Sequence, residues 1–288
     1  MSKLQVALTI AGTDPSGGAG IMADLKSFQA RGVYGMAVAT SVVAQNTQGV
    51  QAICNLDQMI LDEQPKSVFS DIKPDAIKTG MLAKVETIEC VSQYLNTMSC
   101  PYVLDPVMVA TSGDRLISQE AVEALKEKLL PLATIITPNL PEAEVLFGQE
   151  LKDEDAIFKA GKSIQTKYGV KNVVIKGGHL QNEAKDFLFL ENGQVQIFTY
   201  ERIATKHTHG TGCLLGAVLA AFIGLAKDGD LIACLEEAIS VYNIAGELAE
   251  VAAGNALPGS FQIAFLDALC KITNQDVERL KRVEVYCE

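Results

Sequence analysis

A short loop of glycine and histidine is the part of this sequence best suited to chemistry. It reads KHTHGTGC over 206–213 and runs directly into LLGAVLAAF, an apolar stretch that predicts a helix. The glycines at 210 and 212 let the backbone approach a ligand closely, and the N–H groups at the start of a helix bind anions, phosphate above all. The sequence therefore predicts an anion-binding loop over Gly210, Thr211 and Gly212.

A thiol, Cys213, stands at the first turn of this predicted helix. A helix N-terminus lowers the pKa of a thiol from about 8.5, and the resulting thiolate can accept a proton from a hydroxyl or act as a nucleophile. The alternative is a small buried apolar side chain, which is the commonest state of a free cysteine. The other six cysteines have no comparable context, and we expect that alternative for them.

Carboxylates follow two further predicted strands. Asp105 lies in LDPVM, and Asn139 and Glu142 lie in TPNLPE. Oxygen ligands of this kind suit Mg²⁺, which usually keeps several waters and binds substrate phosphates together with one or two carboxylates. Each residue alone could instead cap a helix or lie on the surface. Together with an anion-binding loop, they indicate ATP with Mg²⁺.

These residues are separated by elements that alternate between strand and helix. Apolar, β-branched runs typical of buried parallel strands occupy 4–12, 36–45, 75–82, 102–108, 134–139 and 172–178, with amphipathic stretches between them. The run DFLFLENGQVQIFTY alternates on both sides of Asn192-Gly193, which predicts a β-hairpin at an antiparallel edge. The chain from 211 onwards looks mostly helical. We expect one α/β domain over 1–288, with helices on both faces of a mostly parallel sheet.

Ligands in an open α/β sheet gather at the carboxyl ends of the strands. Any one polar residue there could serve a turn, but polar residues follow all six predicted strands. The Gln45 amide suits a heterocycle that offers a ring nitrogen beside an amino group, and Met81 offers an apolar wall. Asp24, on the helix after the first glycine-rich loop, could face the site or solvent. The remaining strand-end residues are Gly12, Thr13, Asp14, Asn46, Thr79, Gly80, Asp105, Asn139, Glu142, Lys176 and Gly177.

Several classes of protein are disfavoured. The formal net charge of −11 disfavours nucleic acid or an anionic membrane surface as the main partner. Neither a signal peptide nor 18 consecutive apolar residues occur, and seven scattered cysteines indicate a reducing compartment, so we expect a cytoplasmic protein. AGTDPSGGAGIMADL lacks the G-x-G-x-x-G spacing of a dinucleotide site. With three histidines in all, His207 and His209 are expected to be loop contacts rather than metal ligands.

Seven motifs, in order along 1–213, resemble the hydroxymethylpyrimidine/phosphomethylpyrimidine kinases of the ribokinase-like superfamily. They are AGTDPSGGAGIMADLKSF, VAQNTQGV, KTGML, LDPVM, TPNLPEAE, IKGGH and HTHGTGC. The resemblance implies a three-layer fold, a homo-oligomer, and ATP-dependent phosphorylation of an aminopyrimidine alcohol and then of its monophosphate. It also implies three sets of site residues. The residues that would line the pyrimidine pocket are Gly12, Asp24, Gln45, Met81, Val107 and Cys213. Those that would bind Mg²⁺ are Asp105, Asn139 and Glu142, and those that would bind the ATP phosphates are Lys176, Gly210, Thr211 and Gly212.

Three other functions stay open. The sister group, pyridoxal kinases, shares most of these motifs, although the Gln45 amide favours a pyrimidine. GTGCLLGAVLAAF and GNALPGSFQIAFLDAL resemble hydroxyethylthiazole kinases instead. A regulator that kept the fold and lost the chemistry is the third alternative. Many ribokinase-like sugar kinases end the anion loop with Asp. Here Cys213 stands in that place. Because phosphoryl transfer has a loose transition state in which positioning and charge neutralisation dominate, we expect Cys213 to assist catalysis less than the loop amides do.

Overall fold

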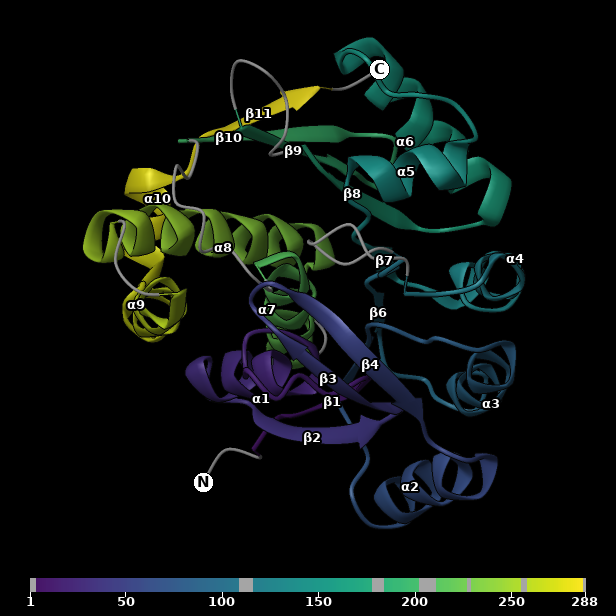
Figure 1. Cartoon of the computed structure of the whole chain (residues 1–288). Helices are drawn as coiled ribbons and strands as arrows, with labels where there is room; N and C mark the ends of the chain where they lie inside the picture. Colours follow the sequence, from purple (N-terminus) through teal and green to yellow (C-terminus); the bar gives the residue numbers. More distant parts are fainter. Residues whose placement is uncertain are drawn as a thin grey trace.

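A nine-stranded sheet forms the centre of the molecule (Figure 1), in a computed structural model that describes residues 4–108, 116–177, 184–201, 211–226, 229–254 and 258–286. Its strand order is β11-β10-β9-β8-β7-β6-β5-β1-β2. The strands are β1 (Val6–Ala11), β2 (Tyr34–Ala39), β5 (Ala76–Thr79), β6 (Tyr102–Leu104), β7 (Ile135–Ile136), β8 (Asn172–Lys176), β9 (Ala184–Phe189), β10 (Val195–Tyr200) and β11 (Val283–Tyr286).

Six neighbouring strands, from β8 across to β2, pair in parallel. Most of their interior residues are apolar without alternation, as in VALTIA of β1, where all six residues are buried. Strands buried on both faces have this composition, which is why the sequence predicts a parallel sheet. All six carboxyl ends therefore open on the same edge of the sheet.

Helices cover both faces of the sheet and give three layers, as the sequence predicts (Figure 1). The layer formed by α1, α7, α8 and α9 packs on the face that carries Ala7, Ala76 and Val103. The opposite layer, formed by α2 to α6, packs on the face that carries Leu8 and Ile77. The helices are α1 (Gly20–Ala30), α2 (Gln58–Asp71), α3 (Val85–Leu95), α4 (Gln119–Lys128), α5 (Leu140–Phe147), α6 (Glu154–Tyr168), α7 (Thr211–Ala226), α8 (Leu231–Ala253), α9 (Pro258–Lys271) and α10 (Asn274–Leu280), with a 3-10 turn at Leu130–Leu132.

The predicted hairpin is confirmed, and one strand beyond it was missed. β9 and β10 pair antiparallel around Asn192-Gly193, where Gly193 has a φ of 88° that suits glycine. The outer edge is formed by β11, which pairs antiparallel with β10. The sequence predicts a mostly helical tail, because the short VEVY segment gives too little alternation to indicate a strand. None of the helices in the described ranges has the length and apolarity needed to cross a bilayer.

The predicted strand over 36–45 is two strands that belong to different sheets. β2 stays in the main sheet, and after Thr40 the chain leaves it as β3 (Ser41–Asn46), which pairs antiparallel with β4 (Gly49–Asn55). Thr13 holds β3 against the end of β1, because its N–H donates to the Ser41 carbonyl and its Oγ1 accepts from the Val43 N–H, both at 3.0 Å. This two-stranded sheet extends over the carboxyl edge of the main sheet (Figure 1).

Candidate active site

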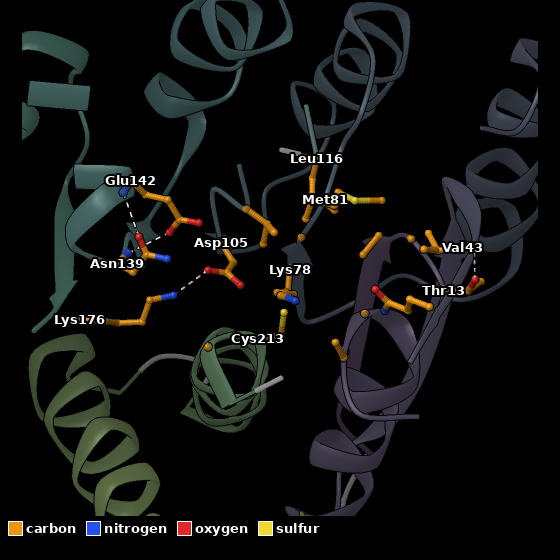
Figure 2. Close-up of a pocket in the computed structure, with 18 residues that line it drawn as sticks. Thr13, Val43, Lys78, Met81, Asp105, Leu116, Asn139, Glu142, Lys176 and Cys213 are labelled. Carbon is orange, nitrogen blue, oxygen red and sulfur yellow. Dashed lines mark hydrogen bonds and ion pairs between the residues drawn. The ribbon is translucent and has the colours of Figure 1, made fainter. Parts of the chain in front are cut away.

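A cavity of about 130 Å³ opens at the carboxyl edge of the parallel strands, beside the β3–β4 sheet and the start of α7. It collects residues from strands β1, β3, β5 and β8 and from the loops that follow β1, β5, β6 and β7 (Figure 2). The lining residues are Ala11, Gly12, Thr13, Ala19, Gly20, Val43, Gln45, Lys78, Gly80, Met81, Asp105, Val107, Leu116, Asn139, Glu142, Lys176, Gly212 and Cys213.

The first glycine-rich loop, between β1 and α1, is filled by its own carboxylate. Asp14 is fully buried and accepts hydrogen bonds from the N–H groups of Gly18 and Ala19, at 3.1 and 2.7 Å, and from Ser16. These amides would otherwise be available to an anion. Asp14 therefore takes up these amides, while Thr13, Ala19 and Gly20 of the same loop line the cavity.

A close backbone contact shapes the wall below this loop. A Cβ on Gly20, whose φ is +55°, would lie 2.3 Å from the Gly12 carbonyl oxygen. A Cβ on Gly12 would lie 2.8 Å from both Met81 Cε and Ser41 Oγ. Position 20 therefore requires glycine, because its φ is positive and the contact is with backbone, whereas a Cβ at position 12 would require the ends of the Met81 and Ser41 side chains to shift.

Gln45 reaches the cavity from β3. Val43 and Gln45 line the cavity, while the alternate residues Val42, Ala44 and Asn46 are exposed, as the two-residue period of a strand requires. The strand register shifts between Ala44 and Gln45. Irregularities of this kind are common next to active sites because they re-aim a side chain. With Met81, this end of the cavity offers one amide and apolar walls, which suits a flat polar ring.

Asp105 and Lys176 form the charged centre of the opposite end. Asp105 Oδ1 accepts from Lys176 Nζ at 3.1 Å and from Thr137 Oγ1 at 2.9 Å (Figure 2). Its second oxygen, Oδ2, is buried and has no hydrogen-bond partner within the part of the chain that the structure describes. A buried carboxylate oxygen without a partner is costly. The unpartnered Oδ2 of Asp105 therefore indicates that a bound ligand or cation supplies the missing contact.

Asn139 and Glu142 form a capping box at the start of α5. The Asn139 side chain accepts from the Glu142 N–H, and the Glu142 side chain accepts from the Asn139 N–H, both at 2.9 Å. This is the helix-cap alternative noted for the sequence, yet both residues also line the cavity. Burial raises the pKa of Glu142 to about 7, although the Lys176 ammonium opposes this shift. Glu142 is thus poised to ionise when a cation arrives.

These donors fit Mg²⁺ that arrives with a nucleotide. Within the described ranges, no group of three or more His, Cys, Asp and Glu side chains could hold a metal by itself. The unpartnered Oδ2 of Asp105 and the nearby Glu142 carboxyl offer one or two oxygens, which is the protein share that Mg²⁺ usually takes beside phosphates and water. Asn139 Oδ1 is already occupied by the helix cap. Of the three residues predicted for the metal, Asp105 is the best suited to direct contact.

Cys213 lies in the first turn of α7 and lines the cavity, as predicted. The expected lowering of its pKa is wrong. Burial raises the pKa of Cys213 to about 12, and although Lys78 opposes this, the Asp105 and Asp24 carboxylates add to it. Desolvation and two anions outweigh the helix N-terminus. The side chain therefore rests as a neutral thiol at pH 7.

Asp24 does not line the cavity, which corrects the expected pyrimidine contact. Its carboxylate is fully buried and binds Lys78 Nζ through both oxygens, at 3.0 and 2.9 Å, while Thr9 Oγ1 donates to it at 2.6 Å. These partners hold Asp24 behind the cavity wall. The side chain that lines the cavity is Lys78, which the sequence analysis missed. The available signal was a lysine inside the otherwise apolar strand DAIKT.

Most of the predicted site is thus assembled in one place. Gly12, Gln45, Met81 and Val107 lie in the cavity wall with Gly212 and Cys213. Gly210, His207 and His209 lie outside the described residues, and of Thr211 the structure describes only its place at the start of α7. Apolar and small wall residues went unpredicted because their types carry no chemical signal; these are Ala11, Ala19, Gly20, Val43 and Leu116.

Known proteins are similar in sequence to this chain over most of its length. The family model for phosphomethylpyrimidine kinase matches residues 14–255. A hydroxymethylpyrimidine/phosphomethylpyrimidine kinase from Staphylococcus aureus is 53% identical over 241 residues, which span 83% of this chain and 86% of the relative. The tail after residue 255 lies outside the match to the family model.

Solved structures show the same architecture. The phosphomethylpyrimidine kinase of Clostridium difficile 630 superposes with a TM-score of 0.72 at 38% identity, over 83% of this chain and 96% of that one. The pyridoxal kinase of S. aureus in complex with ADP superposes with a TM-score of 0.79 at 28% identity, over 99% of both chains. The sequence match and the shared fold agree with the motifs in the cavity, and the chain belongs to the phosphomethylpyrimidine kinase family.

Proposed function

We propose that this chain is a phosphotransferase that uses ATP and Mg²⁺ to phosphorylate 4-amino-5-hydroxymethyl-2-methylpyrimidine and then the resulting monophosphate. One observation carries the proposal. A single cavity has the Gln45 amide and Met81 at one end and the Asp105–Lys176 pair at the other, with Cys213 at the start of α7. A flat ring at the first end would direct its hydroxymethyl group toward phosphates at the second.

The reaction follows from this arrangement. The acceptor oxygen forms a bond to the γ-phosphorus of ATP, the bond from that phosphorus to the β-phosphate oxygen breaks, and the electron pair leaves with ADP. Because phosphoryl transfer has a loose transition state, positioning and charge neutralisation dominate. Lys176 supplies a positive charge at this end, and Mg²⁺, when bound beside Asp105 and Glu142, supplies more. Cys213 is neutral, so it contacts the acceptor rather than removing its proton, which passes to the transferred phosphoryl group or to water.

Pyridoxal kinase activity is the second candidate. It is supported by the likeness to the S. aureus pyridoxal kinase along the whole chain. The pyrimidine is favoured by the higher identity of the pyrimidine kinase relative and by the Gln45 amide, whose donor and acceptor match an aminopyrimidine edge. Gln45→Leu should therefore lower kcat/KM for the pyrimidine while leaving the dissociation constant of ADP unchanged.

The deciding assay offers hydroxymethylpyrimidine, pyridoxal and hydroxyethylthiazole separately with ATP and Mg²⁺, and identifies the products by mass. A pyrimidine monophosphate followed by its diphosphate supports the proposal. Turnover of pyridoxal alone would support pyridoxal kinase activity. Turnover of the thiazole alone would support hydroxyethylthiazole kinase activity, which the C-terminal motifs resemble. Binding of the nucleotide without turnover of any alcohol would indicate a regulator.

The proposal includes a cytoplasmic homo-oligomer, as the sequence resemblance and the seven scattered cysteines imply. Light scattering of the purified protein at several concentrations measures the subunit number. A mass that stays at 30.8 kDa throughout would contradict the oligomer.

A further inference from the structure

A buried ion pair between Lys78 and Asp24 lies at the cavity wall, apart from the groups proposed to hold the ring, the metal and the phosphates. Lys78 and Asp24 are both fully buried, and their side chains meet at 2.9 Å. Burial lowers the pKa of Lys78, but the Asp24 carboxylate, together with Cys213 and Asp105, more than offsets it and keeps that pKa above its ordinary value. The lysine is therefore a cation. A buried ion pair of this kind is weak evidence for stability, because the desolvation of both charges offsets their attraction.

The two charges of the Lys78–Asp24 pair lie at different distances from the cavity. Lys78 lines the cavity, whereas Asp24 lies behind it and accepts from Thr9 on β1. The positive end of the pair therefore faces the cavity. Among the described residues that line the cavity, Lys78 and Lys176 are the cations, and Lys176 is already paired with Asp105 at 3.1 Å.

Two glycines form the slot that holds Lys78. A Cβ on Gly80 would lie 3.2 Å from Lys78 Nζ, and a Cβ on Gly216, in α7, would lie 3.3 Å from Lys78 Cε. The Gly216 position would also lie 3.5 Å from Asp105 Cβ. Lys78 therefore passes between the end of β5 and the first turns of α7, next to Asp105. Figure 2 shows it near Cys213, between the Asp105 group and Thr13.

The two proposed acceptors, the pyrimidine alcohol and its monophosphate, differ in the charge that they would bring close to Lys78. The alcohol is neutral where it reacts, whereas the monophosphate brings about two negative charges. Those charges enter a site that already contains Asp105, Glu142 and the phosphates of the nucleotide. A fixed positive end close to that point favours the charged acceptor and has little effect on the neutral one.

We infer that Lys78 is a specificity-determining residue of this site, which acts through space to support phosphorylation of a phosphate monoester over that of a neutral alcohol. The inference rests on the proposed function, since it concerns the second of the two phosphorylations. Asp24 is then the residue that positions Lys78.

The test removes both charges together. Lys78→Met alone would leave Asp24 as an uncompensated buried charge, so the variant is Lys78→Met/Asp24→Asn, in which Asn can still accept from Thr9. The matched control is Lys281→Met/Glu236→Gln, which removes a partly buried pair, 3.2 Å apart, that does not line the cavity. The measurements are kcat/KM for the alcohol and for the monophosphate, each added as the sole acceptor, the dissociation constant of ADP, and the thermal midpoint.

We expect the Lys78/Asp24 variant to lose about tenfold more kcat/KM for the monophosphate than for the alcohol, a difference of ~1.4 kcal/mol. The dissociation constant of ADP should stay within about twofold, and the control should lose equally for both acceptors. An equal loss for both acceptors in the Lys78/Asp24 variant, or no loss in a folded variant, would overturn the inference. Wild-type protein that does not phosphorylate the pyrimidine alcohol would instead contradict the proposed function.

A second variant covers the case in which the double variant does not fold. Gly216→Ala keeps both charges but presses a methyl group against the Lys78 stem, at 3.3 Å, and Gly216 does not line the cavity. The ratio of the two kcat/KM values should shift in the same direction, by a smaller factor of about three, or ~0.6 kcal/mol. An unchanged ratio in this variant would contradict a role for the position of Lys78.

Discussion

Glu142 should make the free protein less stable as the pH rises, and Glu142→Gln should remove most of that dependence. The pKa of Glu142 rises from its ordinary 4.5 to about 7. Each pKa unit corresponds to ~1.4 kcal/mol, so ionisation of Glu142 in the folded protein costs about 3 kcal/mol relative to the unfolded chain. The folded state holds this proton more tightly, so the stabilisation is complete below pH 4.5 and is lost as the pH rises through 7. About 2 kcal/mol of the change falls between pH 5.5 and pH 8.

The assay is urea unfolding of both proteins at these two pH values, with EDTA present and without nucleotide. The substitution itself is mild, because glutamine can also fill the third position of a capping box and accept from the Asn139 N–H. Glu150→Gln is the control, since Glu150 is exposed and pairs with Lys152 on the surface. Its free energy of unfolding should follow the wild type within a few tenths of a kcal/mol. Equal pH dependence for wild type and Glu142→Gln would refute the assignment of a buried, proton-holding carboxyl.

Three further substitutions test separate parts of the structure. Gly161→Ala should destabilise the protein by about 1–3 kcal/mol in urea unfolding, because the new Cβ would lie 2.3 Å from the Phe189 ring. Gly212→Ala should keep the thermal midpoint, since its Cβ would make an ordinary contact of 3.7 Å with Lys176 Nζ; weaker ADP binding in calorimetry would then report a phosphate at that point, and unchanged binding would exclude one. Asp186→Asn should flatten the stability profile around pH 6, because burial raises the pKa of Asp186 to about 6 and folding favours its protonated form below that pH.

The parallel sheet and the site at its carboxyl edge could be predicted because both depend on local composition. Apolar runs bounded by Gly, Asn and Asp identify strands and the turns after them, and parallel strands bring those turns together. The same reasoning could not separate β2 from β3. The apolar run continues through Thr40, and the change of sheet depends on Thr13, which lies far away in the sequence. The edge strand β11 was missed for a similar reason, since it forms only by pairing with β10.

The two errors in the site concern the charge of Cys213 and the position of Asp24. Cys213 was placed correctly, but its titration depends on Asp105, Asp24 and Lys78, which reach it from other elements of the fold. The family resemblance implies a pyrimidine contact for Asp24, but its partner Lys78, which is 54 residues away along the chain, holds it behind the cavity wall.

A charged residue inside an apolar strand is therefore a stronger indication of a functional role than a polar residue at a strand end is. A strand-end residue such as Asn139 can always serve a turn or a cap, and Asn139 does so here. A lysine in the middle of a buried strand has no such local use, and it persists only with a partner and a slot that fits it. Lys78 has both, in Asp24 and in the space left by Gly80 and Gly216. Because the pair adds little stability and turns its positive end toward the cavity, the acceptor chemistry is the place to measure its effect.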